Sequence, residues 1–354
     1  MKLLEIQGMR GLAIAIVAIF HFTIMWDGVM TKGHSFYPFA DFAEPVHTVL
    51  RQGRLGVELF FIISGFVVAL TLEKCFSTRE FFVKRFSRLW PPLLVCLPIV
   101  WGVLQVAAPL PLASKSPLAL LESFTLVDPA VLGPLNTGNV SGVLWSLWIE
   151  IQFYAVSGFL YFRTKNFLRT LVVLGFVYSA LYVMGAVYSM PPQISALLSL
   201  RNYFWWFIAG VCVHKIRQTG ASKSLWVIYA ASFLMSSLSL GEITYGWRSV
   251  FAYLFNASIF MLFFGFAKRR PLTLLKIKPL VALGNSSYEF YLIHEVLGVS
   301  VLHALKDHTA LSGTWLIIPI FATIWIISFA VNRYWSGASC IKTRQKLLNS
   351  LIRA

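Results

Sequence analysis

The sequence is short of charge, and above all of negative charge. Charged residues make up only 12% of the 354 residues, and 14 Asp and Glu face 30 Lys and Arg, which gives a net charge of +16. A basic balance can indicate nucleic acid binding. Here the basic residues form short clusters between apolar runs. We therefore expect no nucleic-acid partner and no separate soluble domain.

Cysteines and familiar catalytic signatures are also scarce. The sequence contains no GxSxG, GxGxxG, Walker A or HExxH motif. Nothing therefore predicts a serine-hydrolase elbow, a nucleotide-binding loop or a zinc protease. The cysteines lack CxxC spacing, which argues against a disulfide framework or a zinc site and favours apolar packing. We expect no metal and no permanently bound cofactor. The four cysteines are Cys75, Cys96, Cys212 and Cys340.

Apolar runs of membrane-spanning length fill the sequence instead. Hydrophobic residues make up 58% of the chain, and a helix needs about 20 mostly apolar residues to cross a bilayer. We predict an all-α, polytopic integral-membrane bundle of about ten transmembrane helices, forming a single domain over residues 1–354. The expected spans are 10–27, 55–73, 89–108, 144–162, 167–189, 199–216, 223–240, 248–267, 280–304 and 312–334.

The basic residues predict how these spans are oriented. With the N-terminus inside, the cytoplasmic segments carry 23 of the 30 Lys and Arg residues, and the outer segments carry 7. The positive-inside rule then predicts that both ends are cytoplasmic, including a basic tail at 335–354. The first apolar run lacks a small-x-small cleavage site, so we expect a retained helix rather than a signal peptide. Two long outer loops, 28–54 and 109–143, could shape a binding site.

Arg10 and His21 form the first polar pair, in the run RGLAIAIVAIFH. Eleven residues turn about 1100°, so both side chains share one helix face, with the histidine ~16 Å deeper. Ionisable groups inside membrane spans are rare and mark chemistry or a transport path. The structural alternatives are a boundary anchor for Arg10 and, for His21, a hydrogen bond to a neighbouring helix.

The second polar segment is GRLGVELFFIISGF, residues 53–66. Arg54 and Glu58 are four residues apart and can pair on one face, so an ion pair at a helix end is the structural alternative to a functional role. Ser64 lies further along the segment as a supporting candidate. The three glycines of this segment permit a close approach of helices.

The third polar segment is FFVKRFSRLWP, residues 81–91, at the expected cytoplasmic boundary. Arg85 and Arg88 are three residues apart and are expected to point the same way. Guanidinium groups suit phosphate oxygens, so a phosphorylated cytosolic donor could bind there. The alternative is a topology signal in contact with lipid headgroups.

The fourth polar segment is LWSLWIEIQFY, residues 144–154. Glu150 is expected ~9 Å inside the fourth span, with no basic residue near it in the sequence. A carboxyl there must be protonated, paired across helices or open to a wet cavity. Trp145 and Ser146 precede it as supporting candidates.

The fifth polar segment is LGNSSYEFYLIHEVL, residues 283–297. Tyr288, Tyr291 and His294 follow one another at intervals of three residues, which places them near one another on a helix. His294 lies deep in the ninth span. Polar packing and direct catalysis explain this group equally well.

These five segments, in this order, resemble the acyltransferase-3 family of bacterial integral-membrane O-acyltransferases, over residues 5–334. Arg10 and His21 match the R-x10-H signature of that family. GVELFFIISGF resembles its GVDLFFVLSGF-like run, with Glu58 in place of the commoner Asp. Arg85 and Arg88 match its R-x-x-R. WSLWIE resembles its WSL-x-x-E block, and SYEFYLIH resembles its SY-x-x-YL-x-H block.

The resemblance implies transfer of an acyl group, usually acetyl, from acyl-coenzyme A to a hydroxyl of an envelope glycan or lipid-linked saccharide. Acetyl-CoA would be a co-substrate, and the protein would lie in the bacterial inner membrane, among lipids. Some members carry a C-terminal SGNH-hydrolase-like domain, and this chain resembles the stand-alone members. The rival interpretation is a proton-coupled transporter, in which the same buried groups relay protons.

The resemblance and the residue chemistry together predict roles for these residues. His21 is expected to deprotonate the acceptor hydroxyl, or to carry the acyl group itself, because imidazole titrates near neutral pH. Glu150 and Glu58 are expected to orient the imidazole or bind sugar hydroxyls. Arg85 and Arg88 are expected to hold the coenzyme A phosphates, with Arg10 guiding the donor. The supporting residues are His294, Tyr288, Tyr291, Trp145, Ser146, Arg54 and Ser64.

Overall fold

The computed structural model describes residues 3–25, 44–107, 114–133, 137–240, 247–305 and 313–335. Within these ranges every regular element is helical, which confirms the all-α prediction. The helices are α1 (Leu4–Phe20), η1 (His21–Met25), α3 (Glu44–Arg51), η2 (Gln52–Leu55), α4 (Gly56–Leu72), α5 (Thr78–Ala107), α6 (Pro117–Thr125), α7 (Pro129–Leu132), α8 (Leu144–Tyr161), α9 (Phe167–Val187), α10 (Pro192–Leu197), η4 (Ser199–Asn202), α11 (Phe204–Thr219), α12 (Lys223–Leu240), α13 (Trp247–Ala267), η5 (Thr273–Lys276), α14 (Lys278–Asn285), α15 (Ser287–Leu305) and α16 (Gly313–Trp335).

Seven helices in the described part of the chain are long and apolar enough to cross a membrane. They correspond to seven of the predicted spans, so the chain is a multi-pass membrane protein. The other three predicted spans fall on α8, α11 and α15, which are helical but shorter or more polar. α8 and α15 carry several of the candidate site residues, whose polarity lowers the mean hydropathy of these two helices, and α11 is shorter, with 16 residues.

Two helices begin well before the predicted span. The first span was expected from residue 10, but α1 already begins at Leu4. The third was expected from residue 89, but α5 begins at Thr78. Helices can extend beyond the apolar core of the bilayer, so their first turns are helical without being apolar. Arg10 and Arg88 therefore lie inside helices and not at their ends.

Other predicted boundaries also differ. The predicted span 280–304 is two helices, α14 and α15, separated at Ser286. The predicted loop 28–54 contains α3 and η2 in its second half, while residues 26–43 lie outside the described residues. The predicted loop 109–143 contains α6 and α7 and packs on the bundle. Its Ser123 side chain is fully buried there. The predicted tail is not described beyond residue 335.

Glycines bring the central helices close together, as expected from residues 53–66. A Cβ on Gly65 would lie 2.1 Å from the carbonyl oxygen of Phe207 on α11. Gly53 and Gly56 face α1 in the same way. On the other side of α1, a Cβ on Gly284 of α14 would lie 1.8 Å from a backbone oxygen of α1. Only glycine permits these approaches, which fix α1 between α4 and α14.

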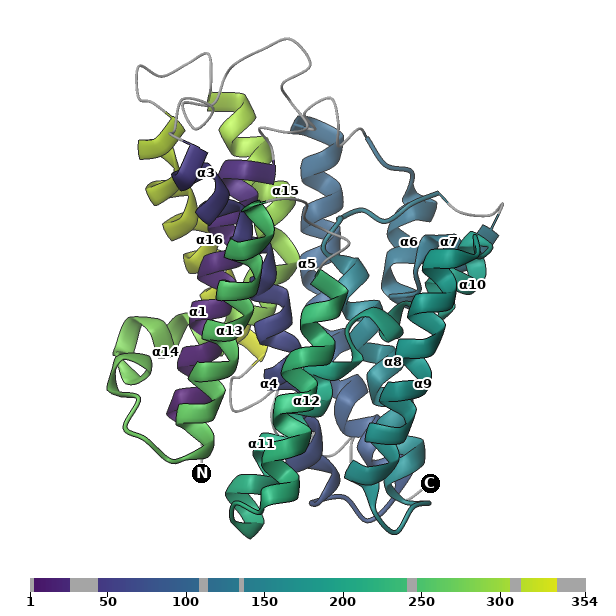
Figure 1. Cartoon of the computed structure of the whole chain (residues 1–354). Coiled ribbons are helices and arrows are strands. Elements are labelled where there is room, and N and C mark those ends of the chain that lie inside the picture. Colours follow the sequence, from purple (N-terminus) through teal and green to yellow (C-terminus); the bar gives the residue numbers. More distant parts are fainter. Residues whose placement is uncertain are drawn as a thin grey trace.

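The bundle brings the five polar segments together, although they are far apart in the sequence. α1 packs against α4, α14 and α15, and α15 packs in turn against α5 and α16 (Figure 1). α4 also packs against α8 and, more extensively, α11. The helices that carry the polar segments therefore surround a common interior.

Candidate functional site

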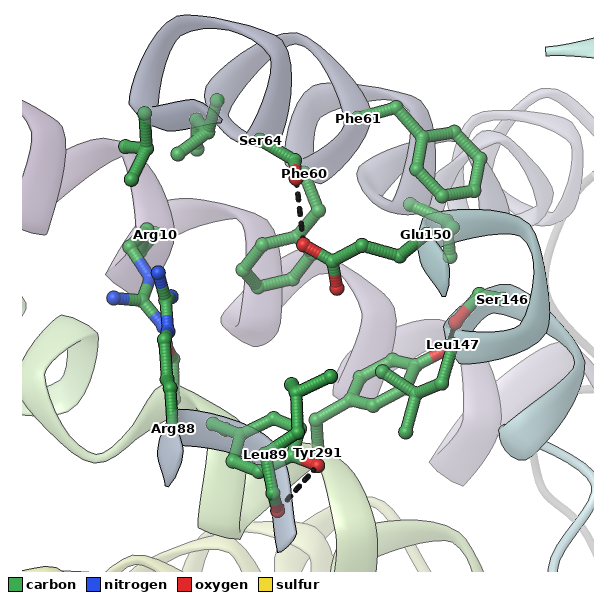
Figure 2. A pocket seen from close by; sticks show the side chains of 15 residues that line it. Arg10, Phe60, Phe61, Ser64, Arg88, Leu89, Ser146, Leu147, Glu150 and Tyr291 are labelled. Carbon is green, nitrogen blue, oxygen red and sulfur yellow. Dashed lines mark hydrogen bonds between the residues drawn. The ribbon is translucent and has the colours of Figure 1, made fainter. Parts of the chain in front are cut away.

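A cavity of about 70 Å³ lies between α1, α4, α5, α8 and α15. A single water needs roughly 15 Å³ on this measure, so the cavity has room for several waters or a slender chain. Figure 2 shows side chains from these helices around it. Its polar lining residues are Arg10, Ser64, Arg88, Ser146, Glu150, Ser287, Tyr288 and Tyr291. All five predicted segments thus contribute to the lining of one cavity, segment 81–91 through Arg88 and Leu89.

Glu150 is held by hydroxyl groups from two helices. Ser64 on α4 donates to Glu150 Oε1 over 2.6 Å, and Tyr154 donates to the same oxygen over 2.5 Å. Glu150 Oε2 makes no hydrogen bond to any described residue, and Figure 2 shows the carboxyl group at the cavity. The need for a partner at this depth is therefore met by a neighbouring helix together with the cavity.

Arg10 and Arg88 face the same cavity from α1 and α5 (Figure 2). Both side chains are half-buried, and neither guanidinium group forms a hydrogen bond or ion pair with a described residue. Arg88 is close enough to repel Arg10 electrostatically. Two unpaired cations in a confined space favour an anion, and guanidinium groups are suited to phosphate oxygens.

Arg85 does not join this pair, contrary to the prediction that it points with Arg88. Its side chain is 5% exposed and lies outside the cavity lining. Its Nη2 donates to Thr71 Oγ1, and its guanidinium carbon lies 5.3 Å from the ring centroid of Tyr154. Three residues turn about 300°, so the remaining ~60° directs Arg85 toward α4 and Arg88 toward the cavity. Of the three arginines predicted to bind the donor, Arg88 and Arg10 thus line the cavity and Arg85 does not.

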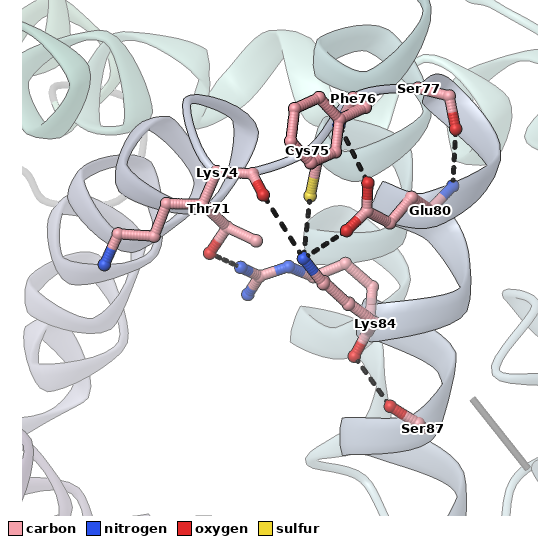
Figure 3. Close-up of polar contacts among 9 residues, drawn as sticks. Thr71, Lys74, Cys75, Phe76, Ser77, Glu80, Lys84 and Ser87 are labelled. Carbon is pink, nitrogen blue, oxygen red and sulfur yellow. Dashed lines mark hydrogen bonds and ion pairs between the residues drawn. The ribbon is translucent and has the colours of Figure 1, made fainter. Parts of the chain in front are cut away.

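Lys84, the third basic residue of that segment, is also bound within the protein (Figure 3). Its Nζ lies 2.6 Å from Glu80 Oε1 and donates to the carbonyl of Lys74 over 3.4 Å. The same Nζ lies 3.6 Å from the sulfur of Cys75. Cys75, like the other two described cysteines, is a buried free thiol, as apolar packing predicts. Cys340 lies outside the described residues.

His21 contacts a second buried histidine. It is the first residue of the π-helical turn η1, a turn type that often occurs at functional sites. Its Nδ1 lies 2.8 Å from the carbonyl of Val17 and 3.2 Å from His294 Nε2. The two rings meet edge to face, with centroids 4.8 Å apart. His294 is completely buried, and its Nδ1 lies 2.9 Å from the carbonyl of Tyr291.

Two carbonyl acceptors determine where the protons of these neutral rings lie. A carbonyl only accepts, so His21 Nδ1 donates to Val17 and His294 Nδ1 donates to Tyr291. His294 Nε2 is then an acceptor, which fits its contact with the Nδ1–H of His21. The remaining nitrogen, His21 Nε2, carries a lone pair and has no hydrogen-bond partner among the described residues. This is the arrangement of a general base.

Tyr291 connects the histidine pair to the cavity. Its ring lines the cavity and lies 5.6 Å from the ring of His294, centroid to centroid. Its hydroxyl group lies 2.7 Å from Ser146 Oγ, on α8. Tyr288, one turn earlier, donates to the carbonyl of Leu89 over 3.1 Å. The predicted cluster on α15 therefore divides, with His294 at His21 and the two tyrosines at the cavity wall.

Arg54 and Glu58 lie outside this cavity and do not pair as expected. No ion pair within 4 Å joins them in the described structure, and Arg54 Nη2 and Glu58 Oε2 both lack a hydrogen-bond partner there. The hydrogen bonds of His21 come from Val17 and His294, so neither Glu58 nor Glu150 orients the imidazole in this structure.

The contact between His21 and His294 joins residues 273 positions apart. No sequence spacing connects two such distant segments, which is why sequence reasoning missed it. The depth of both histidines in their helices was the available signal. Glu295 is another buried acid beside this pair, and it accepts hydrogen bonds from Ser141 Oγ at 2.8 Å and Val143 N at 3.2 Å.

Comparisons with known proteins agree with the helical membrane architecture. A protein family described as an acyltransferase domain matches residues 3–333. Nodulation protein 10 of Rhizobium leguminosarum bv. viciae is 28% identical over 191 residues, which cover 48% of this chain and 52% of that protein. A protein of Komagataeibacter xylinus named as a membrane-bound transacylase, BcsY, is 25% identical over 245 residues, 64% of this chain and 55% of that protein.

A third relative is the acyltransferase MdmB of Streptomyces mycarofaciens, which is 25% identical over 273 residues, 70% of this chain and 68% of that protein. The chain therefore spans about half the length of the first two of these relatives. No solved structure is significantly similar to this chain.

Proposed function

The chain belongs to the acyltransferase-3 family of membrane-bound acyltransferases, and on that premise we propose that it transfers an acetyl group from acetyl-coenzyme A to a hydroxyl of a cell-envelope glycan or lipid-linked saccharide. The observation that carries this proposal is the contact of His21 with His294. It leaves His21 with an unprotonated nitrogen in the membrane interior, as a base for hydroxyl attack requires.

We propose a single domain of ten crossings in the bacterial inner membrane, with both ends in the cytoplasm. α11 and α15 support this number, because most of their residues are buried inside the bundle. A helix that faces other helices need not be as apolar as one that faces lipid. The excess of Lys and Arg in the expected cytoplasmic segments supports the orientation.

In this proposal Arg10 and Arg88 bind phosphate oxygens of the donor, which enters from the cytoplasm. Their freedom from protein partners and their shared cavity support this role. Glu150 faces them and balances one of the two positive charges when the donor is absent. Arg85 holds α5 against α4 through Thr71 and is removed from the donor site.

The chemistry then needs one proton acceptor and one proton donor. The acceptor hydroxyl oxygen attacks the thioester carbonyl carbon while its proton passes to His21 Nε2. The carbon–sulfur bond breaks, and the leaving thiolate takes a proton from the imidazolium, releasing coenzyme A as a thiol. A new ester remains on the sugar. His294 Nε2 accepts a hydrogen bond from His21 Nδ1 throughout and so keeps the reactive nitrogen fixed.

The test is turnover of acetyl-CoA by purified protein in lipid nanodiscs, followed as released thiol and as acetylated sugar. His21→Ala is expected to reduce turnover at least about 100-fold, the contribution of a general base. His214→Ala is the matched control, because His214 is also a buried histidine but pairs with Glu73 at 2.9 Å, on other helices. It should retain turnover.

Full turnover in His21→Ala would contradict the base assignment. Flux of a substrate across liposomes without consumption of acetyl-CoA would instead favour the transporter. His294→Gln and His294→Leu separate positioning from packing, because glutamine still offers an oxygen to His21 Nδ1. We expect turnover to fall less in the glutamine variant, with an unchanged KM for the donor in both.

A further inference from the structure

A second polar cluster lies on η2, α4, α8 and α11, apart from the polar lining of the cavity and from the histidine pair. It combines three aromatic rings with unpaired polar atoms. We propose that this cluster, defined by Arg54, Glu58, Phe61, Trp145 and Tyr203, binds the ring of a saccharide. The proposal rests on the proposed function only in naming that sugar as the acceptor.

The aromatic part joins three helices. Tyr203 precedes α11, and its ring centroid lies 5.2 Å from that of Phe61 on α4 and 5.4 Å from that of Trp145 on α8. Phe61 and Trp145 lie 6.4 Å apart. Isolated tryptophans at a membrane boundary are common. Here Trp145 is 37% exposed, and its ring contacts those of Phe61 and Tyr203, so it forms part of an aromatic platform.

The polar part adjoins Phe61. Glu58 precedes Phe61 by three residues on α4, which places both on one side of that helix, and Arg54 lies in the adjoining 3-10 turn η2. Glu58 is only 5% exposed, and its Oε2 has no hydrogen-bond partner in the described structure. Arg54 Nη2 and, beside Tyr203, Asn202 Oδ1 also lack one. Tyr203 lies within electrostatic reach of both Arg54 and Glu58.

Unpaired buried polar atoms need an explanation, because each costs about 1–3 kcal/mol and native proteins satisfy nearly all of them. Three helical segments, η2, α4 and η4, each contribute one such atom to this cluster. A ligand that pairs with them would remove this cost. The cluster therefore has the properties of a binding site and differs from the turn between α4 and α5, where Lys84 Nζ pairs with Glu80.

The residues restrict the chemistry of that ligand. It must donate hydrogen bonds to the Glu58 carboxyl group and accept them from the Arg54 guanidinium group. It must also present an apolar face to Trp145 and Tyr203. A simple cation would be repelled by Arg54, and an acyl chain would leave Glu58 unpaired. A pyranose ring meets all three conditions, with hydroxyl groups at its edge and C–H groups on its face.

The cluster shares a wall with the donor cavity. Phe61 lines that cavity and also belongs to the aromatic platform. Ser146, the neighbour of Trp145 on α8, lines the cavity too. A sugar held at the platform would thus lie next to the site proposed for the donor. This assigns Arg54 and Glu58 to sugar binding and removes Glu58 from acid–base chemistry.

The test is saturation-transfer-difference NMR on the full chain in nanodiscs, without acetyl-CoA. The probes are methyl α-glucopyranoside, methyl α-galactopyranoside and methyl N-acetyl-glucosaminide, each at up to about 50 mM, because single-sugar sites bind with millimolar affinity. We expect transfer to the ring C–H protons of at least one glycoside. Trp145→Ala and Glu58→Gln should reduce it by at least about fivefold. Trp315→Ala is the matched control, since Trp315 on α16 is 64% exposed and far along the sequence.

Three outcomes would overturn the sugar site: no transfer to any glycoside, equal transfer in all variants, or transfer to glycerophosphoethanolamine alone, which would indicate a lipid headgroup. Released thiol is measured in parallel on the same protein preparations after acetyl-CoA has been added. If acetyl-CoA is not consumed but saturation transfer to the glycoside falls in Trp145→Ala, the proposed function fails and the sugar site stands. If acetyl-CoA is consumed but saturation transfer to the glycoside is unchanged in Trp145→Ala, only the sugar site fails.

Discussion

The cavity proposed to bind the donor and the turn between α4 and α5 both contain basic and acidic side chains, but these are unpaired in the cavity and paired at the turn. In the cavity, Arg10 and Arg88 have no partner among the described residues, and one oxygen of Glu150 is free. At the turn, Lys84 pairs with Glu80, and Arg85 donates to Thr71. The two regions adjoin on α5, where Lys84 and Arg88 are about one turn apart.

This contrast separates charges that stabilise the fold from charges available to a ligand. A charged group satisfied by the protein gains little from a further ligand, whereas an unpaired one gains a full charge-assisted hydrogen bond. Neither composition nor spacing distinguishes the basic residues of segment 81–91 from one another. Their partners distinguish them, and the variants below test this distinction.

The largest effect is expected from removing both cavity arginines. Arg10→Gln with Arg88→Gln should weaken coenzyme A binding by about 100-fold or more, since two charge-assisted contacts are lost. The apparent melting temperature should change little, because neither side chain bonds to a described residue. Isothermal titration of the nanodisc protein with coenzyme A measures the first quantity. Binding at wild-type affinity would show that the donor phosphates lie elsewhere.

Arg85→Ala should lower the stability of the protein and leave its affinity for the donor unchanged. It removes a buried side chain that bonds to α4 and leaves a cavity, at a cost of about 2–4 kcal/mol. The half-life of thermal inactivation should be clearly shorter for Arg85→Ala than for the wild type. The half-life of Arg88→Ala should equal that of the wild type. Thermal inactivation of the two variants in one detergent gives the comparison. The reverse order would invert the roles assigned to these two arginines.

Glu150→Gln should act in the opposite direction on donor binding. It keeps the shape and the hydrogen bonds from Ser64 and Tyr154 but removes the negative charge that faces the arginines. Coenzyme A, an anion, should then bind more tightly, because a charge that repels its phosphates is removed. The same titration measures it. Weaker binding would mean that Glu150 contacts the donor directly.

The smallest effect is expected from Lys84→Ala. The ion pair with Glu80 is an i,i+4 contact near the surface, which contributes less than about 0.5 kcal/mol. Coenzyme A affinity and thermal inactivation should both remain at wild-type values within error. A loss of affinity comparable to that of the Arg10 and Arg88 variant would extend the donor site to the turn and remove the contrast.

Much of the fold could be predicted, because a membrane-spanning helix is recognisable in the sequence as a long run of apolar residues. Seven predicted spans match helices that are long and apolar enough to cross. The glycines of 53–66 were correctly read as contact points, since their Cβ positions are filled by α1 and α11. The predicted starts of α1 and α5 were wrong, because hydropathy detects the apolar core of a helix and not its polar first turns.

The candidate residues could be found from the sequence, but their pairing could not. Arg10, His21 and Glu150 stood out because each is a polar group in an apolar run, and Arg88 because it belongs to a basic cluster at the boundary of one. Their spacing could not reveal that His294 approaches His21, or that Arg85 turns toward Thr71. Helix periodicity relates residues within one helix, and every one of these contacts crosses between helices or depends on a rotation of about 60°.

The sequence by itself determined that the chain is a helical membrane protein, that ionisable groups lie inside it, and which family it belongs to. These follow from apolar length and from short motifs, which are local properties of the chain. Only the tertiary structure decided which of those groups are satisfied by the protein and which are left for substrates. That decision depends on what each side chain meets on the next helix, because inside a membrane no solvent is available to replace a missing partner.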